Sequence, residues 1–134
     1  MPTRFTEQSQ RFRPNSNEEQ VLQKAREHFE ATLIGVQGEL AGSVAAMEHR
    51  RADDALNYCE IFLRDNVPVM IYLMLEGRFA IVKQFLSVSL QLQSTNVQTR
   101  GVFPTSFVEE EGELVADYGQ RSIGRITSVD ASLW

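Results

Sequence analysis

The residues best suited to chemistry lie between Asn57 and Pro68, where a polar cluster precedes a strongly apolar segment. Arg64 and Asp65 stand side by side within it. A planar guanidinium donates several hydrogen bonds and a carboxylate accepts them, so this pair can bind a polyhydroxylated ligand. The alternative is structural: a local ion pair, with Asp65 or Asn66 capping the helix that follows.

The apolar segment that follows this cluster is expected to be a helix that begins at Pro68, because proline suits the first helical position. Residues 67–75 are apolar on every side, which predicts a helix covered all round by protein. Gly77 ends it, and residues 79–93 carry apolar side chains at helical spacing. The short connection predicts an antiparallel helix pair.

Two further elements are predicted on either side of this pair. Ser16 and Glu19 resemble a capping box, and apolar residues then recur every three or four positions, which predicts a helix over about 17–37. Residues 38–56 show no clear period. Residues 103–108 and 114–118 flank the turn sequence Glu111-Gly112, which predicts a short β-hairpin.

Composition excludes several classes of protein. The 134 residues are 43% apolar and 23% charged, with a net charge of -5, which disfavours a nucleic-acid partner. The apolar runs are shorter than the roughly 20 residues that cross a bilayer, and no secretory signal opens the chain. The single cysteine, Cys59, fits a reducing compartment, and we expect a cytoplasmic protein. The charged stretch 48–54 matches no metal motif, and a solvated loop is the better interpretation.

The motifs around the Arg64-Asp65 pair also occur together in a known family. Asn57-Tyr58, followed by Phe62, Arg64-Asp65 and Val67-Pro68, resembles the signature of the alkaline/neutral invertases, glycoside hydrolases that split sucrose. Further matches follow in order at residues 76–77, 81–86, 90–93, 104–107, 123–125 and 129–134. Each match alone is weak, but the ordered set, which spans about 17–134, is specific.

The resemblance implies an all-α fold, in which the chain is the N-terminal portion of an (α/α)6 barrel with a small β-hairpin insertion. Residues 1–16 are then a flexible tail, and residues 17–134 are the first segment of a longer glycosidase domain. It implies a sugar substrate, sucrose, with no metal, cofactor, nucleic acid or membrane partner, and leaves a homo-oligomeric state open. Residues expected to bind the substrate are Tyr58, Arg64, Asp65, Ser106, Asp130 and Trp134.

Glycoside hydrolysis usually requires two carboxyl groups. The chain offers four carboxylates as candidates, and their spacing does not say which share a substrate: Glu60, Asp65, Asp117 and Asp130. The resemblance places both catalytic carboxylates of the family beyond Trp134, so no catalytic residue is assigned, and the chain alone is expected to be inactive. For Asp130 and Trp134, a helix cap and a core aromatic residue are equally good interpretations.

Two residues depart from the family pattern. Cys59 stands where an aspartate is usual, and Asn66 where a phenylalanine is usual. Replacing a carboxylate by a thiol removes a charged acceptor. Two alternatives to sucrose hydrolysis stay open: a divergent glucosidase with another substrate, which the Cys59 departure suggests, and a non-catalytic sugar-binding or interaction module, which the expected truncation suggests.

Overall fold

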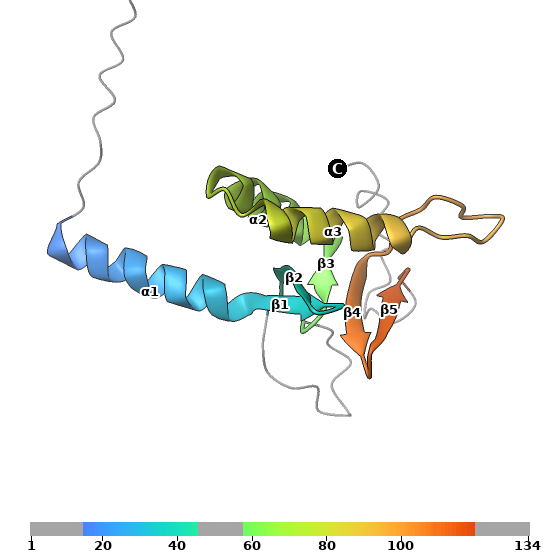
Figure 1. Cartoon of the computed structure of the whole chain (residues 1–134), viewed down its shortest axis with the longest axis horizontal. Coiled ribbons are helices and arrows are strands. Elements are labelled where there is room, and N and C mark those ends of the chain that lie inside the picture. Colours follow the sequence, from blue (N-terminus) through green and yellow to red (C-terminus); the bar gives the residue numbers. More distant parts are fainter. Residues whose placement is uncertain (1–14, 46–57, 120–134) are drawn as a thin grey trace, which may run out of the picture. The chain divides into compact units, whose positions relative to one another are not determined.

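The computed structural model describes residues 15–45 and 58–119 (Figure 1). By its internal contacts the chain divides into two units, Met1–Glu30 and Ala31–Trp134. The predicted tail and the charged stretch 48–54 fall almost entirely on residues outside the described ranges.

Helix α1, Ser16–Thr32, begins where the sequence predicts a helix, but with a different cap. Asn15, rather than Ser16, accepts hydrogen bonds through Oδ1 from the backbone N–H groups of Asn17 (3.1 Å) and Glu18 (3.0 Å). Glu18 Oε2 in turn accepts from the backbone N–H of Asn15 at 2.7 Å. This is a capping box one residue earlier than predicted. No residue of α1 is buried.

A β-hairpin follows α1 where the sequence predicted that the helix would continue. Strand β1, Leu33–Val36, pairs antiparallel with β2, Glu39–Ser43, across a turn at Gln37 (φ 56°) and Gly38 (φ 82°). The register shifts between Ile34 and Gly35. This bulge brings both Leu33 and Val36 to a buried position, so their spacing of three imitates a helical period.

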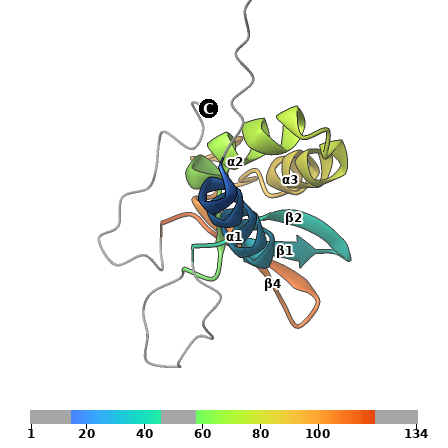
Figure 2. The same cartoon turned by 90° about the vertical axis from the view of Figure 1, so that its left-hand side faces the viewer.

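Helices α2, Leu63–Leu75, and α3, Phe79–Gln91, form the expected helical pair and lie side by side in both views (Figures 1 and 2). The connection is a Schellman motif: Arg78 N–H donates to the Leu73 carbonyl at 2.8 Å and Gly77 N–H to the Met74 carbonyl at 3.0 Å. Gly77 has φ 75°, which glycine adopts at little cost.

The start of α2 was predicted wrongly. The helix begins at Leu63, so Pro68 lies inside it and removes one internal hydrogen bond. The capping position belongs to Phe62, which makes no side-chain cap. Asp65 and Asn66 are therefore residues of the first turns, and neither caps the helix.

The second sheet has three antiparallel strands in the order β3-β4-β5. Strand β3, Ile61–Phe62, pairs with β4, Ser106–Glu110, which pairs with β5, Glu113–Asp117. The predicted hairpin is present, and its turn has φ 52° at Glu111 and 83° at Gly112. Positive φ at both turn residues matches the twist of paired strands.

The core of the second unit lies between the two helices and the two sheets. Strand β2 and helix α3 make the most extensive contacts between a helix and a sheet. The buried apolar residues are Leu33, Val36, Ala41, Val44, Ile61, Leu63, Met70, Leu73, Ile81, Val82, Phe85, Val88 and Phe107.

The predicted all-α fold class is wrong. The described residues form three helices and two small antiparallel sheets, a mixed α and β content. Residues 33–36 and 39–43, expected to be helix and unpatterned loop, pair with each other. The hairpin expected as an insertion gains a third strand from residues just before α2.

Gly42 permits the close approach of β2 to the start of α2. A Cβ at this position would lie 2.7 Å from Ile61 Cγ2 and 3.0 Å from Asn66 Oδ1. Ile61 is fully buried and has no room to move. Gly42→Ala is therefore expected to lower the free energy of unfolding by about 1–3 kcal/mol, the usual cost of overpacking. Urea denaturation followed by circular dichroism measures this, and an unchanged midpoint would contradict the packing described.

Candidate functional site

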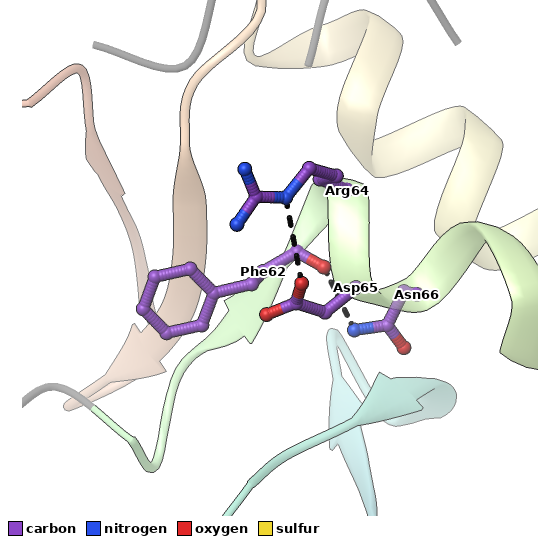
Figure 3. Close-up of polar contacts among 4 residues, drawn as sticks. All are labelled: Phe62, Arg64, Asp65 and Asn66. Atoms are coloured by element: carbon purple, nitrogen blue, oxygen red, sulfur yellow. Dashed lines mark hydrogen bonds and ion pairs between the residues drawn. The ribbon is translucent and has the colours of Figure 1, made fainter. Parts of the chain in front are cut away.

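Arg64 and Asp65 lie in the first turn of α2 with their side chains exposed (Figure 3). Arg64 Nε is 3.6 Å from Asp65 Oδ1, and the two side chains are 56% and 64% exposed. An exposed pair of this kind stabilises a fold by only about 0–1 kcal/mol. Its position leaves a charged donor and a charged acceptor accessible to a ligand, at a helix N-terminus that favours negative charge.

Asn66, the next residue, points the other way, toward β2 (Figure 3). It is 2% exposed. Its Oδ1 accepts from the backbone N–H of Ser43 at 2.8 Å, and its Nδ2 donates to the carbonyls of Ser43 (2.9 Å) and Phe62 (2.9 Å). The amide thus bonds both backbone groups of Ser43, as a neighbouring strand would.

Asn66 has a structural role, but not the helix cap that the sequence suggests. Its amide holds the end of β2 against the start of α2, and thereby fixes the turn that carries Arg64 and Asp65. The only signal in the sequence was its departure from the phenylalanine that the family pattern leads one to expect. A phenyl ring has no donor or acceptor for Ser43.

Tyr58 lies at the N-terminal end of the segment that leads into β3 and is 50% exposed. Its carbonyl accepts from the backbone N–H of Ala45 at 3.1 Å, so its backbone is attached beyond the end of β2. Cys59 is partly buried and is a free thiol. Tyr58, Arg64 and Asp65 thus combine an exposed aromatic ring with two exposed charges over eight residues of chain.

Ser106, unlike Tyr58, Arg64 and Asp65, is not exposed. Its side chain is fully buried, and its hydroxyl donates to Glu60 Oε2 at 2.6 Å. Glu60 is itself 1% exposed. The register places Ser106 of β4 between Phe62 and Asp117 of the two neighbouring strands.

Asp117 is 1% exposed, and its Oδ1 accepts from the backbone N–H of Gly119 at 2.8 Å. Of the candidate carboxylates, Glu60 and Asp117 are therefore buried, Glu60 bonded to the Ser106 hydroxyl and Asp117 opposite Ser106 in the strand register, while Asp65 is exposed. Pro104 and Phe107, from the same matching stretch as Ser106, are also buried. Asp130 and Trp134 lie outside the described residues.

The described part of the chain contains no group of three or more His, Cys, Asp or Glu residues able to hold a metal ion. None of the helices in that part combines the length and the apolar character that crossing a membrane requires. Tyr118 donates its hydroxyl proton to the carbonyl of Leu92, and burial raises the pKa of this phenol.

Comparison with known proteins identifies the class to which this arrangement belongs. The family model described as alkaline and neutral invertase matches residues 25–134. Two proteins of Arabidopsis thaliana, the alkaline/neutral invertases CINV1 and CINV2, are each 32% identical to the chain over 126 residues. The mitochondrial neutral/alkaline invertase 1 of Oryza sativa subsp. japonica is 35% identical over 120 residues. The chain belongs to the alkaline and neutral invertase family, and the predicted resemblance is confirmed.

The match covers most of this chain but little of its relatives. The match with CINV1 covers 85% of this chain and 23% of CINV1, and the match with CINV2 covers 85% of this chain and 22% of CINV2. The match with the rice mitochondrial protein covers 77% of this chain and 19% of that protein. The chain therefore spans about a fifth to a quarter of the length of these relatives. Among the relatives are proteins named as cytosolic, mitochondrial and chloroplastic.

Proposed function

We propose that this chain contributes the sugar-binding N-terminal segment of an invertase-type glycoside hydrolase that splits sucrose into glucose and fructose. The observation that carries the proposal is the exposed Arg64-Asp65 pair in the first turn of α2, within the residues that match the family. Its solvent exposure makes it a weak stabiliser of the fold and leaves both charged groups within reach of a ligand.

Within this proposal the residues have different roles. Arg64 donates to sugar hydroxyls and Asp65 accepts from them, while Tyr58 offers an aromatic face. By the family resemblance, Asp130 and Trp134 also contact the sugar; both lie outside the described residues. Ser106 takes part as a positioning residue, because its hydroxyl bonds buried Glu60 rather than facing solvent.

The chemistry needs a second part of the domain. A glycosidase places two carboxyl groups on opposite sides of the bond that breaks. In the described part of the chain, Glu60 and Asp117 are buried and Asp65 is exposed, so these three do not form a shared open site. We therefore propose that the 134 residues alone are inactive and that the catalytic carboxylates come from the remaining part of an invertase domain. We also propose that the protein works in the cytoplasm.

A glucose-release assay on two proteins tests this proposal. The first is the purified chain, and the second is the chain joined to the part of CINV1 that follows the matched segment. We expect no glucose from sucrose with the first and turnover with the second. Robust turnover by the chain alone would contradict the proposed inactivity. A folded, soluble fusion that leaves sucrose intact would contradict the proposed function.

The same fusion isolates the role of Arg64. We expect Arg64→Ala to lower kcat/KM for sucrose by roughly 10–100-fold, because a charge-assisted hydrogen bond contributes about 1.5–3 kcal/mol. Arg100→Ala is the matched control, since Arg100 is exposed in the loop after α3. Equal rates for the two variants would show that Arg64 does not contact the substrate.

A further inference from the structure

The outer side of the α2–α3 pair is an apolar groove of about 400 Å³. Its floor is buried: Met70, Val82 and Phe85 are 6%, 9% and 6% exposed. Its rim is open to solvent. The rim is formed by Ile71, Met74, Leu86 and Leu90, with exposures of 55%, 50%, 53% and 59%. We call this surface the α2–α3 groove.

The lining of the groove carries no charge. Ser89 is its one polar side chain, and its hydroxyl donates to the Phe85 carbonyl at 2.7 Å, so it offers no donor to a ligand. The rim residues repeat at helical spacing, three apart on α2 and four apart on α3, which forms parallel ridges. Such ridges accept the side chains of another helix. Among the described residues of the groove, a sugar, with hydroxyls all round, finds no free side-chain donor.

The described part of the chain does not cover the apolar helix over 67–75 on every side. Leu75 is 83% exposed, and Phe79, at the start of α3, is 63% exposed. Contiguous apolar surface of this kind is rare on a monomeric protein and marks an interaction site. The helices themselves are well formed, with a complete Schellman connection, so the open face is a property of a folded unit.

The length comparison indicates the occupant. The family match runs through both helices, and the matched relatives carry at least three quarters of their length outside the matched segment. That additional chain also has helices or strands with apolar faces to bury, and the open face of this helix pair offers them a matching apolar surface. We propose that the α2–α3 groove binds an apolar helix from the remaining part of an invertase domain, which packs across the rim of the two helices.

This proposal rests on family membership and deepens the proposed function by naming the surface that the rest of the domain covers. It assigns the groove to protein and the exposed Arg64-Asp65 turn to sugar. The two surfaces lie on the same helix α2 but differ in chemistry, one uncharged and one charged.

Thiol labelling measures whether the groove is covered. Cys59→Ser removes the only cysteine of the chain, and Leu86→Cys or Ile71→Cys then places a single thiol on the rim. Val97→Cys is the matched control, because Val97 is 86% exposed in the loop after α3 and does not line the groove. Each variant is labelled with a maleimide as the chain alone and as the fusion to the CINV1 remainder.

We expect the rim thiols to react rapidly in the chain alone and about tenfold or more slowly in the fusion, since labelling then requires local opening. The control thiol keeps its rate. A folded fusion whose rim thiols react as fast as in the chain alone would overturn the proposal. If the rim thiols of the chain alone react more slowly as its concentration rises, the proposal is also overturned, because a second copy of the chain then occupies the groove.

The labelling result is independent of sucrose. Protected rim thiols without glucose release would retain the interface and reject the proposed function. Glucose release with unprotected rim thiols would support the proposed function and reject the interface. Circular dichroism of each variant establishes that it is folded before its labelling rate is compared.

Discussion

Phe107→Ala lowers the free energy of unfolding by about 3–5 kcal/mol, the range for deleting a buried phenyl ring. Phe107 is fully buried on β4, the central strand of its sheet, opposite Ile61 on β3 and Ala116 on β5. Its ring centroid lies 6.2 Å from that of Phe85 on α3, with the two planes inclined at 37°. The ring therefore joins the sheet to the helix pair, and its deletion leaves a cavity between them.

Urea denaturation of matched variants tests this expectation. Phe79→Ala removes the same ring from a 63% exposed position on α3 and is expected to cost less than about 1 kcal/mol. Phe107→Leu keeps most of the volume and should give an intermediate loss, which remains measurable if the alanine variant does not fold. Equal losses at positions 79 and 107 would show that the ring of Phe107 is not the centre of this core.

Asn66→Ala is expected to cost about 2–4 kcal/mol, because it deletes three hydrogen bonds and leaves both backbone groups of Ser43 unsatisfied. An unpaired buried backbone group loses its water without gaining a partner. The lost hydrogen bonds join Ser43 at the end of β2 to Asn66 in α2, 23 residues later in the chain. Their loss should therefore loosen the attachment of β2 to α2. Hydrogen exchange at the Ser43 amide is therefore expected to accelerate together with the fall in stability.

Two further variants separate this role from a general loss of an amide. Gln98→Ala removes an exposed amide from the loop after α3 and should change stability by less than about 0.5 kcal/mol. Asn66→Asp keeps an acceptor for the Ser43 N–H but loses both donors and adds a buried charge, so it should be no more stable than the alanine variant. Full stability of Asn66→Ala, with slow exchange at the Ser43 amide, would contradict the proposed role of Asn66 in holding β2 against α2.

Local sequence was enough to predict the helices and turns that residues close together in the chain define. Helix α3 starts at the predicted residue and ends two residues early, because its apolar stripe has a simple helical period. The β4–β5 turn follows from Glu111-Gly112, since glycine readily adopts the positive φ that the turn requires. The family follows from ordered short motifs, which also need no knowledge of the fold.

The predictions failed where one element is defined by a distant one. The β1–β2 hairpin has a bulge whose spacing imitates a helix, and only pairing with β2 reveals it. The predicted substrate-binding role of Ser106 stays a prediction, but the bond from its hydroxyl to Glu60, 46 residues earlier in the chain, is a contact that local sequence does not encode. The expected all-α class was wrong for the same reason, since both sheets depend on pairings that no single segment encodes.

The sequence by itself therefore determined the family, the helix pair, the β4–β5 hairpin and the presence of an Arg-Asp pair before an apolar helix. Only the tertiary structure decided which of these polar groups face solvent and which face the core. It exposed Arg64 and Asp65, buried Ser106 and Asn66, and left one side of the apolar helix open as a groove. The physical reason is that helical period and turn chemistry act over a few residues, whereas burial depends on which distant segment packs against each side chain.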